Sequence, residues 1–221
     1  MMAKKSSSSS LESLKNASLL AAFLLVVWGF YRLIFRLPEE IEELFIKPVV
    51  WLLPVFYFLR KEGKGISSLG FTLKNLFPAV YFSLGLGFIF IFESLLINYL
   101  KYGSFNFAAN IGDKPFFTAL FLSFATAFSE EVTFRGYLFN RVWLALKNEA
   151  LANISTSLIW ALIHVPVVVF VWKFNLSASI LYLFLTTIFG IGSAFVFART
   201  KNIVSSILLH VLWEWPLILF R

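Results

Sequence analysis

Long apolar stretches alternate with short polar ones along the whole chain. The stretches that are apolar enough to be membrane-spanning helices occupy residues 17–36, 44–60, 76–100, 116–139, 151–172, 177–198 and 202–220. Most of them approach or exceed the roughly 20 residues that a helix needs to cross the hydrocarbon core of a bilayer. The pattern therefore predicts an all-α, polytopic membrane protein with about seven transmembrane helices, or eight if one of them is split or re-entrant.

The composition agrees with this class. Hydrophobic residues make up 59% of the chain and charged residues 14%, which a soluble domain of this size could not hide from water. The lipid bilayer is therefore an expected partner. The chain has no cysteine, so a disulfide framework, a thiolate metal site and a cysteine nucleophile are excluded. The net charge of +7 is explained by a basic inner face, and we predict no binding to nucleic acid.

Lysine and arginine collect in alternate connecting segments. With the N-terminus inside, the inner segments hold twelve of the 19 Lys and Arg residues and the outer segments hold seven. Because cytoplasmic segments carry the excess of these residues, we predict a multi-pass protein of the cell membrane with a cytoplasmic N-terminus. Residues 1–16 are predicted to be a flexible polar tail and residues 17–114 to form the N-terminal transmembrane helices.

Two adjacent carboxylates and an arginine interrupt the fourth apolar stretch, as Glu130, Glu131 and Arg135. An ionised side chain at that depth costs at least ~2.5–3.5 kcal/mol, so such groups are paired, hydrated or functional. Glu131 and Arg135 are four residues apart on one face of a helix, the favourable order for an acid and a base. Glu130 is rotated by about 100° from Glu131. We therefore expect Glu131 to pair with Arg135 and Glu130 to do chemical work.

The two histidines of the chain, His164 and His210, lie within later apolar stretches. At ~1.5 Å per helical residue, Glu130, His164 and His210 all lie roughly 14–21 Å from the cytoplasmic ends of their helices, so they can meet at one level. A buried carboxylate with an imidazole beside it can activate water, and a second imidazole can stabilise an oxyanion. The same three residues could instead ligate a divalent metal such as zinc. Both arrangements indicate a hydrolase.

Glu130-Glu131-x-x-x-Arg135, then Trp160-x-x-x-His164, then His210 with a polar residue four positions later together resemble a known pattern. It is that of the CAAX protease and bacteriocin-processing family of intramembrane endopeptidases, which includes the type II CAAX prenyl protease. The resemblance covers residues 115–218 as a catalytic domain and extends to Gly136-Tyr137-Leu138-Phe139 and Pro166. It implies a helical fold with a cavity open to the cytoplasmic side. It also implies a membrane-associated peptide or a prenylated protein as substrate.

Carried over residue by residue, the resemblance makes Glu130 the general base with His164 beside it, and His210 with Glu214 the binding site for an oxyanion or a metal. Glu131, Arg135 and Trp160 would support them. The chain departs from the family twice: Trp160 replaces the usual Phe, which keeps the packing role, and Glu214 replaces the usual Asn or Asp. An ionised Glu cannot donate a hydrogen bond to an oxyanion. Glu214 would therefore have to be protonated, bind a metal or orient His210.

Three alternatives to an active endopeptidase follow from the same residues. A catalytically silent family member could act as a membrane immunity or scaffold protein, as the Glu214 departure suggests. A transporter could use Glu130, His164 and His210 as a proton relay, although the sequence shows no internal repeat of the kind expected for one. Finally, Glu130 and Glu131 could be a structural pair neutralised by Arg135 and Arg141.

Overall fold

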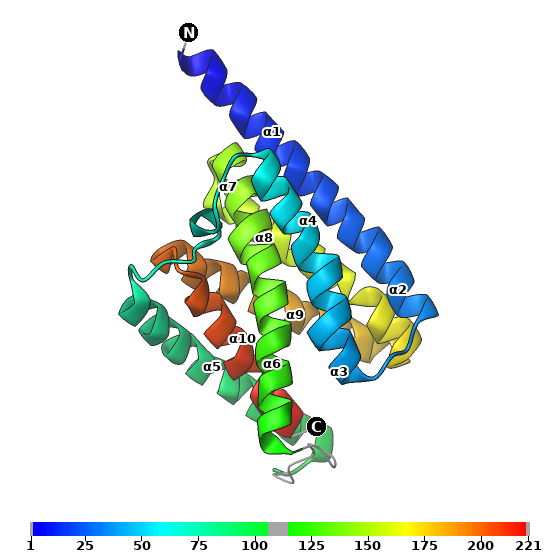
Figure 1. Cartoon of the computed structure of the whole chain (residues 1–221). Helices are drawn as coiled ribbons and strands as arrows, with labels where there is room; N and C mark the ends of the chain where they lie inside the picture. The colour runs from blue at the N-terminus through cyan, green and yellow to red at the C-terminus, as the bar shows by residue number, and fades with distance from the viewer. Residues whose placement is uncertain (1, 106–114, 220–221) are drawn as a thin grey trace.

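The structure, a computed structural model, describes residues 2–105 and 115–219, and within them the side chains of 11–100, 102–105 and 115–215. Every secondary-structure element in the described part of the chain is a helix. Seven long helical runs follow one another (Figure 1). They are α1 (Met2–Phe23) with η1 (Leu24–Trp28) and α2 (Gly29–Ile34); α3 (Glu39–Ile41) with η2 (Glu42–Ile46) and α4 (Lys47–Lys61); α5 (Leu76–Tyr102); α6 (Phe116–Glu131) with η4 (Val132–Phe139) and α7 (Asn140–Leu146); α8 (Glu149–Ile163) with η5 (Val167–Val171); α9 (Leu176–Thr200); and α10 (Ile203–Leu219).

The helical class and the membrane character are confirmed. Four described helices are long and apolar enough to cross a membrane, at Leu11–Ile34, Leu76–Leu100, Glu149–Val171 and Leu176–Thr200, and Ile203–Trp215 is a shorter apolar helix. The two remaining runs correspond to the predicted spans 44–60 and 116–139. Both carry several charged side chains, which lowers their apolar content although they are helical throughout most of their length.

The first helix begins earlier than the sequence predicted. Residues 1–16 were expected to form a flexible polar tail, but α1 starts at Met2 and runs continuously into the apolar part of the helix. Extending an existing helix is easier than starting one. The serine-rich residues before the apolar segment can therefore continue its helix toward the N-terminus. Asn16 is fully buried. It accepts a hydrogen bond from Lys61 Nζ at 3.0 Å and donates one to Glu62 Oε1 at 3.3 Å.

The connections between helices gather at two opposite ends of the bundle. One end holds the start of α1 and the connections 62–75, 147–148 and 201–202, and the other holds 35–38, 103–105 and 172–175 (Figure 1). Hydrogen bonds tie the first end together: Asn202 Nδ2 donates to the carbonyls of Thr72 and Lys74, both at 2.9 Å, and Asn75 Nδ2 donates to the carbonyl of Thr200 at 3.0 Å. The start of α1 and the 35–38 connection therefore lie at different ends of the molecule.

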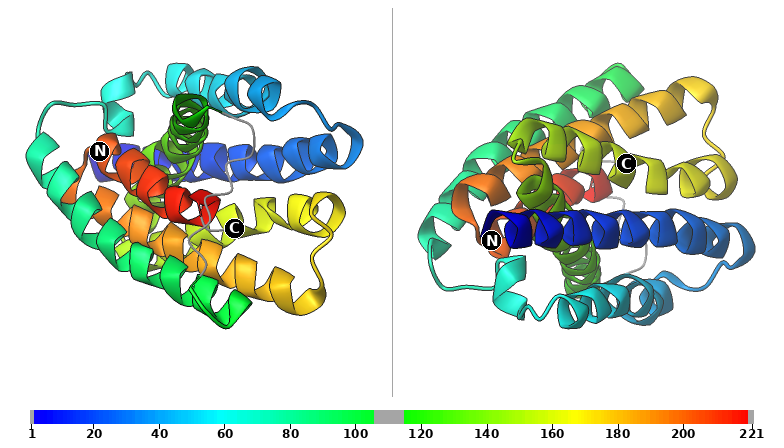
Figure 2. Two further views of the ribbon diagram at one scale, coloured as in Figure 1. Left: turned by 90° about the horizontal axis from the view of Figure 1, so that it is seen from below. Right: turned by 90° about the horizontal axis from the view of Figure 1, so that it is seen from above.

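The core of the bundle is aromatic. Trp51, Phe134, Trp160, Phe189 and Phe197 are among its largest fully buried side chains. Helix α6 lies between α4 and α10 and brings its charged residues into this core (Figure 2). Large apolar side chains such as Phe77, Phe88 and Phe117 are exposed on the outside of the bundle, as expected for a surface that faces lipid.

A wide π-helical turn, η4, directly follows Glu131 and continues the helix to α7. All eight of its residues are buried. Such turns insert an extra residue into a helix and are frequent at functional sites. Here the turn contains Arg135, whose guanidinium points back to the carboxylate four residues earlier.

Candidate active site

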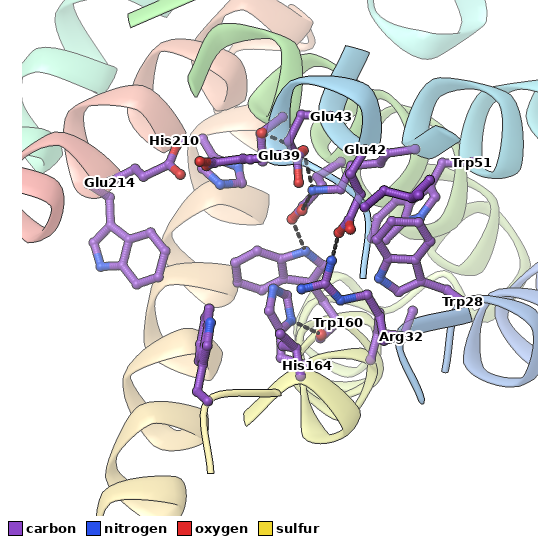
Figure 3. Close-up of a pocket in the computed structure, with 18 residues that line it drawn as sticks. Trp28, Arg32, Glu39, Glu42, Glu43, Trp51, Trp160, His164, His210 and Glu214 are labelled. Carbon is purple, nitrogen blue, oxygen red and sulfur yellow. Dashed lines mark hydrogen bonds and ion pairs between the residues drawn. The ribbon is translucent and has the colours of Figure 1, made fainter. Parts of the chain in front are cut away.

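A cavity of about 350 Å³ lies among the helices (Figure 3). Its lining includes Glu130 from α6, His164 from the end of α8, and His210 and Glu214 from α10. The predicted convergence of one carboxylate and two imidazoles from three helices is therefore present in the structure. Their catalytic roles remain predictions.

Glu130 is buried and both of its carboxylate oxygens are occupied. Lys47 Nζ donates to Oε1 at 3.0 Å, and the indole Nε1 of Trp160 donates to Oε2 at 2.8 Å. Each carboxylate oxygen can accept more than one hydrogen bond, so Glu130 can still accept one from a water molecule in the cavity. The two donors fix the direction in which the carboxylate points.

Trp160 thus does more than pack. The sequence predicted for it only the packing role of the usual Phe, whereas the indole N–H is a donor that Phe does not have. Its place four residues before His164 puts both side chains on one face of α8, and the two rings lie 4.8 Å apart. That spacing is visible in the sequence and could have suggested a polar role.

Lys47 is the site residue that the sequence analysis missed. Lys47 is one of the seven basic residues of the predicted outer segments, but it is buried and bridges two carboxylates, Glu130 and Glu43. Its Nζ lies 2.5 Å from Glu43 Oε2, which also accepts a hydrogen bond from Thr126 Oγ1 at 2.6 Å. The available signal was Glu43 and Lys47 four residues apart at the start of an apolar stretch.

Glu131 is fully buried and holds three partners. Arg135 Nη1 donates to Oε1 at 3.1 Å, His210 Nδ1 lies 2.7 Å from the same oxygen, and Ser193 Oγ donates to Oε2 at 2.6 Å. The pairing of Glu131 with Arg135 is therefore present as predicted. Glu131 also joins α6 to α9 and α10, so it orients one of the two histidines in the cavity.

Arg135 is held by the aromatic core as well as by Glu131. Its Nη2 donates to the carbonyl of Gly190 at 3.2 Å, and its guanidinium carbon lies 4.8 Å from the centre of the Trp160 ring. A Cβ added at Gly190 would come within 3.3 Å of Nη2 and 2.9 Å of the Ser157 Cβ. A glycine at position 190 therefore gives the buried arginine its room.

The two histidines use the same ring nitrogen, Nδ1, for their hydrogen bonds to the protein. Nδ1 of His164 lies 2.8 Å from the carbonyl oxygen of Trp160, and Nδ1 of His210 lies 2.7 Å from Glu131. Both partners only accept hydrogen bonds, so we assign the proton to Nδ1 in each ring. A neutral His164 then has a lone pair on Nε2, where it can accept a hydrogen bond from water. His210 can donate from Nε2 only when its ring is positively charged.

Glu214 does not orient His210 through Nδ1, since that nitrogen faces Glu131. Instead Glu214 Oε2 accepts a hydrogen bond from Ser123 Oγ of α6 at 2.6 Å. Its carboxyl group lines the cavity beside His210 (Figure 3). The sequence left open that Glu214 orients His210. In the structure, Glu131 does this instead.

Arg141 belongs to a separate polar cluster at the end of the bundle where α1 starts. Its Nε donates to Glu62 Oε2 at 2.8 Å, and Tyr137 donates to Glu62 Oε1 at 2.7 Å. The alternative in which Arg135 and Arg141 neutralise the adjacent glutamates therefore holds for Arg135 alone. The cation beside Glu130 is Lys47.

The arrangement does not fit the metal alternative proposed for Glu130, His164 and His210. Within the described residues, no group of three His, Asp or Glu side chains is placed to hold a metal ion. The Lys47 ammonium bound to Glu130 would also repel a divalent cation at that carboxylate.

Comparison with known proteins places the second half of the chain in a family. Residues 112–216 match the model of the family described as type II CAAX prenyl endopeptidase Rce1-like, which is a protease family. No curated protein and no solved structure matches the chain. The matched segment contains Glu130, His164, His210 and Glu214, whereas Lys47 precedes it. The candidate site thus lies in a segment, just under half of the chain, that is similar to the Rce1-like family of type II CAAX prenyl endopeptidases.

Proposed function

We propose that the protein is an intramembrane endopeptidase that hydrolyses a peptide bond of a membrane-associated or prenylated substrate with activated water. The observation that carries the proposal is the cavity itself, which holds a fixed carboxylate, Glu130, and an imidazole, His164, whose Nε2 can accept a hydrogen bond. A water molecule between these two acceptors would be polarised by both.

In the proposed reaction, Glu130 takes a proton from this water while His164 Nε2 accepts a hydrogen bond from its second hydrogen. The water oxygen bonds to the peptide carbonyl carbon, and the carbonyl π electrons move to the carbonyl oxygen. The tetrahedral intermediate collapses when the carbon–nitrogen bond breaks. Glu130 then returns its proton to the departing amine, so the carboxylate is restored.

The negative charge on the carbonyl oxygen needs a donor. His210 supplies one from Nε2 when its ring is positively charged, and the carboxylate of Glu131 at 2.7 Å favours that form. This role replaces the amide donor that the family usually provides four residues after this histidine. Glu214, held by Ser123, would then serve to shape the cavity next to His210.

The test compares wild type with Glu130→Gln, expressed at equal levels in the same host. We expect new peptide termini on membrane proteins, found by quantitative mass spectrometry, with wild type and none with Glu130→Gln. Glu93→Gln is the matched control because it makes the same change in a half-buried membrane-helix residue that does not line the cavity. Identical termini from all three proteins would contradict the proposal and favour a silent family member.

A further inference from the structure

The mouth of the cavity lies at the end of the bundle opposite to the start of α1. The exposed residues among those that line the cavity are Leu37 and Glu39, near the start of α3, and Trp172, at the end of η5. In Figure 1, α3 and the start of α1 lie at opposite ends of the molecule. His164 lies eight residues before Trp172, or ~12 Å along a helix, and fifteen residues after Glu149, or ~22 Å. The candidate site is therefore nearer to the mouth end.

The basic residues gather at the other end. Among the described connections and the helix ends next to them, the end with the start of α1 carries Arg60, Lys61, Lys64, Lys74, Lys147, Arg199 and Lys201, whereas the mouth end carries Arg32, Arg36, Lys101 and Lys173. Lysine and arginine near helix ends favour the cytoplasmic side of a membrane. The positions of the basic residues in the structure therefore agree with the sequence count. Both indicate that the end with the start of α1 faces the cytoplasm.

We infer that the cavity opens on the side of the membrane away from the cytoplasm and that the protein takes its substrate from that side. The side from which substrate is taken rests on the proposed function, whereas the side on which the cavity opens rests on charge and fold alone. A cytoplasmic N-terminus, predicted from the Lys and Arg count, and a cavity open to the cytoplasm, implied by the family resemblance, cannot hold together in this fold. The inference keeps the first expectation and replaces the second.

The inference narrows the class of substrate. It is a peptide segment exposed at the non-cytoplasmic surface, such as the end or a loop of a membrane protein or a peptide during export. A prenylated protein anchored at the cytoplasmic leaflet would not reach the mouth.

The natural absence of cysteine makes the orientation directly testable. Ser67→Cys lies in the exposed 62–75 connection, and Ser177→Cys lies in the exposed first turn of α9 at the mouth end. The same conservative change is thus made at the two ends. A membrane-impermeant maleimide is applied to bacterial spheroplasts and to inverted membrane vesicles from cells that express each variant.

We expect Ser177→Cys to be labelled in spheroplasts and Ser67→Cys in inverted vesicles, each at least tenfold more than in the other preparation. The reverse pattern, or equal labelling of either variant from both sides, would overturn the inference. Labelling needs no catalysis, so this result is independent of the proposed function. A last variant, Leu37→Cys, lies at the mouth. If the orientation holds but maleimide on this cysteine does not block cleavage in spheroplasts, the inference about substrate entry is wrong and the inference about orientation stands.

A second inference rests on a different observation, the buried bridge from Glu43 through Lys47 to Glu130. Lys47 comes from α4, outside the segment 112–216 that matches the family. Its two carboxylate partners come from η2 and α6, and Thr126 of α6 binds Glu43 in turn. We infer that Lys47 is a positioning residue that keeps Glu130 ionised and aimed into the cavity. This inference also rests on the proposed function.

The test uses a fluorogenic peptide built on a bond that wild type cleaves and Glu130→Gln does not. We expect Lys47→Met to lower kcat by about 100-fold, the scale of one step of acid–base catalysis, with KM changed less than threefold. Lys47→Arg, which keeps the charge, should recover at least a tenth of the wild-type kcat. All rates are divided by the amount of monodisperse folded protein.

A purely structural role would lower the yield of folded protein for both variants and leave kcat per folded molecule unchanged, which would overturn the inference. The same holds if Lys47→Arg is as slow as Lys47→Met. If no bond is found that wild type cleaves and Glu130→Gln does not, that result would instead count against the proposed function.

Discussion

The two histidines of the site hold their protons on the same nitrogen but against different partners. The carbonyl of Trp160 is neutral, so it fixes the His164 ring without favouring its charged form. The carboxylate of Glu131 favours a positive His210 ring. Two chemically identical side chains are therefore suited to different tasks: His164 to accept a hydrogen bond from water, and His210 to donate one to an oxyanion.

At this scale the first prediction concerns Glu131, which holds three partners in the core. Glu131→Gln removes the charge opposite Arg135 and leaves a buried cation without its counter-ion. Loss of one partner of a buried ion pair costs about 3–5 kcal/mol. We expect a clearly lower melting temperature in detergent, measured by intrinsic fluorescence, together with loss of cleavage.

Glu149→Gln provides the control for that measurement. Glu149 also pairs with an arginine, Arg199, but both side chains are partly exposed. Surface ion pairs contribute about 1 kcal/mol or less, so this variant should unfold close to wild type. Equal effects of the two substitutions would show that Glu131 is not the structural centre of the site.

The geometry of Glu130 leads to a prediction about metal removal. Because an ammonium and an indole N–H occupy its two oxygens, cleavage should survive treatment with EDTA followed by gel filtration. The rate before and after treatment is compared with the fluorogenic peptide. Loss of activity that returns on addition of zinc would contradict the placement of Lys47 and restore the metal alternative.

At the scale of the elements, helix existence was predictable and helix boundaries were less so. The predicted span 116–139 continues as helix to Leu146, because hydropathy marks where a segment leaves the apolar layer, whereas the backbone can stay helical beyond it. The π-helical turn η4 has no such signature in the sequence. The packing of η4 depends on segments that are distant in the sequence. At Gly136 of this turn, for example, an added Cβ would come within 3.0 Å of the Leu69 carbonyl oxygen.

The connection between the short helix η3 (Ile66–Leu69) and α5 gives a second prediction at this scale. Gly70 has a φ of +91°, and an added Cβ would lie 2.7 Å from Phe197 and 3.0 Å from the backbone nitrogen of Ile203. Gly70→Ala therefore combines backbone strain with a clash, at a cost of about 2 kcal/mol. We expect a lower melting temperature and weaker attachment of the connection to α9 and α10.

Gly63→Ala separates the two effects. Gly63 also has a positive φ, of +62°, but an added Cβ there would meet no other atom within 4 Å. It should therefore cost only the backbone strain, about 1 kcal/mol. The prediction for Gly70 fails if the two variants unfold at the same temperature.

At the scale of the whole molecule, the sequence predicted which residues share a level but not which helices are neighbours. Depth follows from counting residues along each helix, so Glu130, His164 and His210 could be placed together before the structure was known. Lateral packing depends on the rotation and tilt of each helix, which hydropathy does not encode. The partnership of Glu131 with Ser193 and the bridge from α4 through Lys47 are both lateral contacts, and both were missed.

These lateral contacts imply that the family segment is not sufficient for the site. Lys47, Trp28 and Trp51 line the cavity from the N-terminal half of the chain, outside residues 112–216. A fragment of residues 106–221 alone should therefore lack the cation beside Glu130 and show no cleavage. Membrane helices can insert separately and associate afterwards, so co-expression of residues 1–105 with residues 106–221 should restore cleavage and co-purification of the two fragments.

The same pair of fragments carries its own control. Lys47→Met in the 1–105 fragment should still co-purify with 106–221, because α1 and α4 keep their other contacts with η4 and α7, but cleavage should fall as in the intact chain. Cleavage by residues 106–221 alone would contradict the prediction and make the N-terminal helices a shell around a complete site. Failure of the wild-type fragments to associate would instead contradict the premise that the two halves of the chain insert separately and associate afterwards.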